Sequence, residues 1–216
     1  MTTVLLTGFE PFDGERTNPS WEAVAELAAR PANSEYTLVT AELPCVFGTS
    51  IDALRRAITE HRPDLVVCVG QAGGRDAVMP ERVAVNIRDA RIPDNAGDQP
   101  VDGPVVSGGP AAYFTGLPVK ACVSRIQEAG IPASVSHTAG TFVCNNVFYG
   151  LMHLLETEFP QVRGGFVHVP YSPEQVAERE GVPSMPITAI ADALELVVST
   201  SVRTTHDLAV SAGTLH

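Results

Sequence analysis

The stretch Leu65-Val66-Val67-Cys68-Val69-Gly70-Gln71-Ala72-Gly73-Gly74, residues 65–74, indicates how this chain folds. Its first five residues are all apolar, which is typical of a strand buried on both faces inside a parallel sheet. The segment that follows, residues 70–74, contains three glycines and ends the strand in a loop. A strand buried on both faces needs helices above and below it, so we expect an α/β protein.

Strands and amphipathic helices alternate on both sides of this stretch. We expect further strands over residues 4–9, 36–43, 83–87, 133–137 and 165–169, and helices over residues 19–28, 51–60, 119–129, 144–158 and 187–198. This alternation predicts a single-domain three-layer α/β/α sandwich with a mainly parallel central sheet. We expect residues 1–216 to form a single catalytic domain, because no polar linker divides them.

The composition argues against several classes of partner. The chain has 216 residues, a formal net charge of -11 and 44% hydrophobic residues. A protein this acidic is repelled by phosphate backbones and anionic lipids, so we expect no nucleic-acid or membrane partner. The apolar run at residues 4–6 is too short for a signal peptide, and no run approaches the roughly 20 residues that span a bilayer. We therefore expect a cytoplasmic protein.

The four cysteines are widely spaced and form no C-x-x-C pair, which is typical of reduced thiols. Cys45, Cys68 and Cys122 occupy positions where small apolar side chains commonly pack. Cys144 differs, because it follows a turn at residues 138–141 and opens a helix, where free N–H groups favour a thiolate. We expect its pKa to fall, and we expect the same N–H groups to stabilise an oxyanion. A packed structural cysteine is the alternative interpretation.

A cysteine nucleophile needs a base and a group that orients the base. In open α/β sheets the ligand site lies beyond the carboxyl ends of the strands. His168 lies near the end of the last predicted strand, and Glu81 lies in a loop between two others. Taken singly, a hydrogen-bonded core histidine and an ion-paired glutamate are the commoner readings. Taken together, Cys144, His168 and Glu81 are candidates for a nucleophile, its base and the group that orients the base.

Other site chemistries have weaker support. The Gly-rich loop at residues 70–74 lacks both G-x-G-x-x-G and G-x-x-x-x-G-K-[ST] spacing, so it is a poor phosphate cradle. The histidines show no H-E-x-x-H spacing, so we expect no metal and no other cofactor. Two alternatives stay open. One is a nucleoside-phosphorylase-like enzyme that uses the Gly-rich loops for phosphate, and the other is a non-catalytic thiol-containing binding module.

Three groups of motifs carry a family resemblance. They are Thr7-Gly8-Phe9-Glu10-Pro11-Phe12 with Asn18-Pro19-Ser20-Trp21, residues 70–75 through Pro80-Glu81-Arg82-Val83-Ala84-Val85-Asn86, and Ser136-His137-Thr138-Ala139-Gly140-Thr141-Phe142-Val143-Cys144-Asn145. They resemble the pyroglutamyl peptidase I family of cysteine peptidases, also called pyrrolidone carboxyl peptidases. Residues 89–95 and 168–170 fit as well, so the resemblance covers nearly the whole chain. Asp13 and Met79 depart from the family pattern, which often has Gly at the first position and Ser or Thr at the second.

The resemblance implies a function and a set of site residues. It implies that Cys144, His168 and Glu81 are the catalytic set, and that Arg91 helps with the developing oxyanion. The implied activity is removal of N-terminal pyroglutamyl residues from peptides by thiolate attack, through an acyl-enzyme intermediate. The resemblance also implies an α/β/α fold, no metal, and a homo-oligomer, commonly a tetramer.

Pyroglutamate is an uncharged lactam, so its pocket needs apolar walls and a few polar groups for the ring amide. Phe9, Phe12 and Phe142 suit the walls, because they flank the predicted strand ends and the nucleophile. Gln71 is placed to hydrogen-bond the lactam through its backbone or its side chain. The long segment over residues 93–110, rich in Pro, Gly, Asp and Asn, is the best candidate for a lid.

Overall fold

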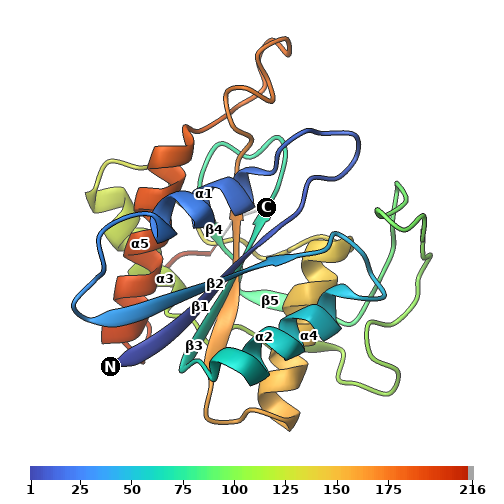
Figure 1. Cartoon of the computed structure of the whole chain (residues 1–216), viewed down its shortest axis with the longest axis horizontal. Helices are drawn as coiled ribbons and strands as arrows, with labels where there is room; N and C mark the ends of the chain where they lie inside the picture. Colours follow the sequence, from blue (N-terminus) through green and yellow to red (C-terminus); the bar gives the residue numbers. More distant parts are fainter. Residues whose placement is uncertain (214–216) are drawn as a thin grey trace.

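The central sheet has the mainly parallel arrangement that the sequence predicts (Figure 1). A computed structural model describes residues 1–213, so residues 214–216 of the predicted domain lie outside the described part. The sheet contains β1 (Thr2–Phe9), β2 (Tyr36–Leu43), β3 (Leu65–Gln71), β4 (Met79–Pro80) and β7 (Arg163–Val169), in the order β2-β1-β3-β7-β4. Every neighbouring pair is parallel except β4 with β7.

Helices cover both faces of the sheet, which confirms the predicted three layers (Figure 1). One face carries α1 (Pro19–Ala28), α3 (Val119–Glu128) and α5 (Ile187–Arg203). The other face carries α2 (Ser50–His61) and α4 (Val143–Thr157). Over residues 1–213, no helix combines the length and the apolar character that crossing a membrane requires.

Alternation along the strands divides the apolar residues into two cores. On β3, Val67 and Val69 pack under α1, α3 and α5, whereas Val66 and Cys68 pack under α2 and α4. All seven residues of β3 are buried, as expected for a strand at the middle of the sheet. The last residues of β3 therefore lie at the carboxyl edge of the sheet, where open α/β proteins bind their ligands.

Two predicted strands differ from the structure. The segment at residues 133–137 forms no strand, because it pairs with the chain around β4 only through single bridges at Ala133 and Ser136. The strand predicted over residues 83–87 is shorter, and β5 (Val83–Val85) lies outside the main sheet in a two-stranded antiparallel sheet with β6 (Ala112–Phe114). Local β propensity marked both segments correctly as extended, but tertiary packing decided whether a ladder formed.

The long loop over residues 93–110 is irregular, as predicted, and it is fastened at both ends. The Asn86 side chain accepts a hydrogen bond from the Val106 N–H group and donates one to the Val106 carbonyl. The buried Asp94 carboxylate accepts one from the Phe47 N–H group at 2.8 Å. These bonds hold the loop against the helix-α2 side of the molecule in this conformation.

Candidate active site

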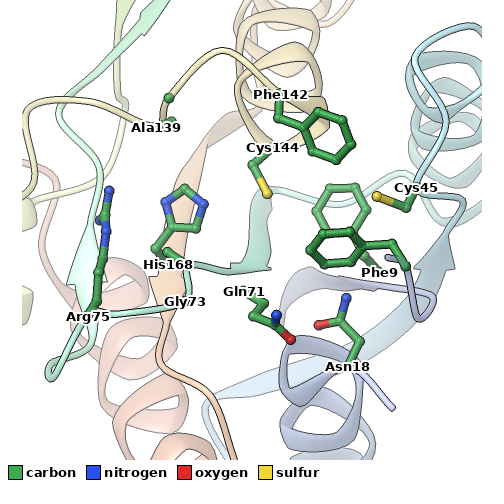
Figure 2. Close-up of a pocket in the computed structure, with 13 residues that line it drawn as sticks. Phe9, Asn18, Cys45, Gln71, Gly73, Arg75, Ala139, Phe142, Cys144 and His168 are labelled. Carbon is green, nitrogen blue, oxygen red and sulfur yellow. The ribbon is translucent and has the colours of Figure 1, made fainter. Parts of the chain in front are cut away.

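A cavity of about 300 Å³ opens where β1, β3 and β7 end and α4 begins (Figure 2). Such a position, at the carboxyl ends of parallel strands, is where open α/β sheets bind their ligands. The cavity is lined by Phe9, Phe12, Asn18, Cys45, Gln71, Ala72, Gly73, Arg75, Ala139, Gly140, Phe142, Cys144 and His168. The walls therefore include two of the three predicted catalytic residues and four of the five predicted substrate-binding residues.

Cys144 is the second residue of α4, and it is partly exposed whereas Cys45, Cys68 and Cys122 are buried. The N-cap residue of α4 is Phe142, whose side chain makes no capping hydrogen bond. The N–H groups of the first helical turn have no acceptor within the helix. This helix end can therefore offer hydrogen-bond donors to a negatively charged atom that forms beside the Cys144 sulfur.

Gly70 leaves room for the Cys144 sulfur on the face of the sheet where His168 lies. A Cβ atom at Gly70 would lie 2.7 Å from the Cys144 Sγ atom, so a larger residue would push the sulfur away. Gly70 is paired with His168 across β3 and β7, and paired residues in a sheet point to the same face. The sulfur therefore occupies the space that a side chain at residue 70 would fill, next to the imidazole. In Figure 2 both side chains lie at the same end of the cavity.

Glu81 fixes the orientation of the His168 ring. The His168 Nδ1 atom donates a hydrogen bond to Glu81 Oε1 at 2.7 Å, and Glu81 is completely buried. The pairing of β4 with β7 positions the carboxylate, and the Glu81 N–H group donates to the Phe166 carbonyl at 2.9 Å. Because Nδ1 carries the proton in this bond, Nε2 is left with its lone pair and can accept a proton.

The predicted fall in the pKa of Cys144 is wrong for this structure. Burial raises the pKa of Cys144 to about 12, the negative charge of Glu81 also raises it, and Arg75 lowers it. Burial likewise lowers the pKa of His168, although its hydrogen bond to Glu81 acts in the opposite direction. Both shifts favour a neutral thiol beside a neutral imidazole, because desolvation penalises each charged form.

The predicted substrate-binding residues fall into two groups. Phe9, Phe12, Gln71 and Phe142 line the cavity, and the rings of Phe12 and Phe142 lie 6.0 Å apart. Phe9 is only 2% exposed, so most of its ring belongs to the core. Arg91 is exposed and does not line the cavity. Its role in oxyanion binding stays a prediction.

Sequence reasoning missed a residue that touches Glu81. Arg75 lines the cavity, and its Nη1 atom donates a hydrogen bond to Glu81 Oε1 at 2.8 Å. No periodic pattern in the sequence connects a loop arginine to a glutamate six residues later. Asn18 and Cys45 also line the cavity without having been predicted to do so.

The two departures from the family pattern have local explanations. Asp13 adopts a φ of 54°, the left-handed conformation that glycine takes without a steric penalty, so a glycine preference there has a backbone cause. Met79 pairs with His168 in the sheet, and its sulfur accepts a contact from Arg75 Nη1 at 3.3 Å. Neither residue displaces a predicted catalytic group.

Comparison with known proteins gives consistent matches. The family model for pyroglutamyl peptidase matches residues 2–204. The pyrrolidone-carboxylate peptidase of Streptomyces coelicolor is 58% identical over 218 residues, and that of Pectobacterium carotovorum is 56% identical over 216, with both chains covered completely. The crystal structure of pyroglutamyl peptidase I from Bacillus amyloliquefaciens has a TM-score of 0.94 and 50% identity, covering 97% of this chain and 99% of that one.

The fold and these relatives define the chain as a hydrolase of the cysteine peptidase class. Within that class, the chain belongs to the pyroglutamyl peptidase family, and its activity is that of a pyroglutamyl peptidase. The nucleoside-phosphorylase-like enzyme and the non-catalytic thiol module find no support among these matches.

Proposed function

We propose that Cys144 is the nucleophile of this peptidase, that His168 is its general base and acid, and that Glu81 orients the imidazole. The observation that carries the proposal is the 2.7 Å bond from His168 Nδ1 to the buried Glu81, beside a partly exposed cysteine at a helix N-terminus. This combination supplies a nucleophile, a base with a fixed tautomer and free N–H donors around one cavity.

The first half of the reaction forms an acyl-enzyme. The Cys144 thiol passes its proton to His168 Nε2 as its sulfur attacks the pyroglutamyl carbonyl carbon, so the thiolate exists only while the imidazole is charged. The carbonyl electron pair moves to oxygen, which the first N–H groups of α4 stabilise. When the tetrahedral intermediate collapses, the C–N bond breaks, and His168 gives its proton to the leaving amine of the shortened peptide.

The second half releases pyroglutamate. Water gives one proton to His168 Nε2 and attacks the thioester carbon, and the C–S bond then breaks. The proton returns from His168 to the Cys144 sulfur, so the enzyme ends in its starting state. The neutral resting pair suits this cycle, because the raised pKa of Cys144 and the lowered pKa of His168 make the proton return complete.

We propose that the side chain of Gln71 donates a hydrogen bond to the lactam carbonyl. The Ser172 N–H group can only donate, so the Gln175 atom that it contacts at 3.1 Å is the oxygen Oε1. Gln175 Nε2 therefore faces Gln71 at 2.9 Å, and the Gln71 atom that accepts this bond is Oε1. This chain of amides leaves Gln71 Nε2 as a donor on a residue that lines the cavity. A hydrogen-bond donor at this position favours the binding of a substrate ring that carries a carbonyl oxygen, as a lactam does.

Phe9, Phe12 and Phe142 are proposed as the apolar walls for the lactam ring. Phe142 also contacts Phe47 edge-on, with ring centroids 5.3 Å apart, so its position is supported from behind. On the family resemblance alone, we also propose that the natural substrates are peptides with an N-terminal pyroglutamyl residue. The same resemblance supports a homotetramer, with Arg91 assisting the oxyanion.

The nucleophile is tested by Cys144→Ser against Cys122→Ser. We expect Cys144→Ser to lower kcat/KM on a pyroglutamyl fluorogenic amide by at least about a hundredfold, because a hydroxyl beside a neutral imidazole is a far weaker nucleophile. Cys122 lies in the other core with its sulfur 3.6 Å from the Ser201 hydroxyl, so a hydroxyl there finds a partner and activity persists. Near-normal turnover by Cys144→Ser would exclude the assignment.

A further inference from the structure

Arg75 shares one carboxylate oxygen with the proposed catalytic histidine. Glu81 Oε1 accepts from His168 Nδ1 at 2.7 Å and from Arg75 Nη1 at 2.8 Å. The second guanidinium nitrogen, Nη2, donates to the Thr138 carbonyl at 2.9 Å. The Arg75 side chain is 21% exposed, whereas the Glu81 side chain is fully buried. The arginine therefore reaches from the cavity wall into the polar interior.

A buried carboxylate is expensive unless a cation accompanies it. Two groups in contact with Glu81 can supply that cation: Arg75, which is always charged, and His168, which is charged only when protonated. If Arg75 supplies the charge, His168 is free to stay neutral and to accept the Cys144 proton. If Arg75 is absent, Glu81 is compensated only when His168 holds a proton, and a protonated imidazole cannot act as a base.

We propose that Arg75 is a positioning residue that neutralises Glu81 and so keeps His168 in its basic, neutral form at the pH where the enzyme works. The inference rests on the proposed catalytic set, and it adds a fourth member that touches neither substrate nor the reacting sulfur. The charged groups that act on His168 are Glu81 and Arg75, and the Cys144 thiol lines the same cavity. Beside the Cys144 sulfur lie two further thiols, Cys45 and Cys68.

The direction of the pH effect follows from these contacts. Arg75 lowers the pKa of His168, and it also lowers the pKa of Cys144. Loss of the positive charge therefore raises both values, and each change moves the onset of activity toward higher pH. A role limited to holding the loop at Thr138 predicts something else, namely an equal loss of activity at every pH.

The experiment compares Arg75→Gln, Arg75→Lys and wild type, with Arg203→Gln as the control. Arg203 forms an exposed ion pair with Glu35 and does not line the cavity, so its loss removes the same charge from a distant surface. For each protein, kcat/KM and the rate of iodoacetamide alkylation of Cys144 are measured from pH 5.5 to 9. The alkylation rate reports on the sulfur and the imidazole without any substrate.

We expect the ratio of kcat/KM at pH 6 to that at pH 8 to fall at least about threefold in Arg75→Gln, with the alkylation profile moving the same way. Arg75→Lys keeps the charge, so its ratio stays close to wild type, as does that of Arg203→Gln. A uniform loss at all pH values in Arg75→Gln, or an unchanged profile, overturns the inference.

Arg75→Lys decides the question if Arg75→Gln does not fold. A lysine ammonium can reach Glu81 but lacks the fork that also binds the Thr138 carbonyl. A pH ratio close to wild type in Arg75→Lys supports the charge role even if total activity drops. A pH ratio in Arg75→Lys that falls as far as the one expected for Arg75→Gln, although the positive charge is kept, overturns the inference. The assay of Cys144→Ser on the pyroglutamyl amide tests the proposed function separately, because Arg75 is unchanged in that variant.

Discussion

The two walls of the cavity are built in different ways and have different tasks. One wall holds Arg75 and His168 over the buried Glu81, and charged hydrogen bonds of 2.7 to 2.8 Å fix it. The other wall holds Phe12 and Phe142, whose ring centroids lie 6.0 Å apart, and Gln71 at the end of β3, whose side-chain amide nitrogen is a hydrogen-bond donor. Charged networks impose orientation, whereas aromatic contacts impose shape. Changes to the first wall should therefore lower kcat, and changes to the second should raise KM.

The largest effect in this comparison is expected from the base of the first wall. His168→Ala should lower kcat on the pyroglutamyl amide by about a thousandfold, because no other group described in the cavity can accept the Cys144 proton. Glu81→Gln should be milder, about ten- to a hundredfold, because a glutamine oxygen can still accept from His168 Nδ1. Steady-state kinetics separates kcat from KM. If Glu81→Gln costs as much as His168→Ala, Glu81 does more than orient the ring.

A smaller effect is expected from the second wall, where a hydrogen bond from Gln175 fixes the orientation of the Gln71 amide. In Gln175→Glu the new carboxylate still accepts from the Ser172 N–H group but cannot donate to Gln71 Oε1. The Gln71 amide must turn round, so its oxygen faces the lactam carbonyl. We expect KM to rise about tenfold, with kcat within about threefold of wild type.

Gln127→Glu is the matched control for this change. Gln127 Nε2 donates to the Ala133 carbonyl on the far side of the sheet, so the substitution removes the same kind of donor and adds the same charge away from the cavity. Its KM should remain near the wild-type value. An unchanged KM in Gln175→Glu would show that the Gln71 side chain does not hydrogen-bond the lactam.

Much of the fold follows from periodicity, and the exceptions have a physical cause. The run at residues 65–69 predicts a central strand, and β3 is buried along its whole length. The helix beginning beside Cys144 is also predicted correctly, to within one residue at each end. By contrast, residues 133–137 look like a strand but form single bridges, because no partner strand of sufficient length lies beside them. Sequence pattern reports local preference, and pairing depends on tertiary neighbours.

The site also contains residues that the sequence predicts and contacts that it does not. The turn before α4 and the end of β7 mark Cys144 and His168, because functional groups gather at the carboxyl ends of parallel strands. The contact between Arg75 and Glu81 leaves no mark in the sequence, since it depends on how the loop after β3 folds back over β4. The protonation state of Cys144 and His168 cannot be read from the sequence either, because it depends on how deeply each group is buried.

Identification of the alkylated sulfur tests whether Cys144 is the nucleophile. The wild-type enzyme is treated with limiting iodoacetamide while turnover of the pyroglutamyl amide is followed, and the modified cysteine is located by peptide mass mapping. We expect activity to fall in proportion to carbamidomethylation of Cys144, while the buried Cys68 and Cys122 stay unmodified. Full turnover by protein whose Cys144 is completely alkylated would contradict it.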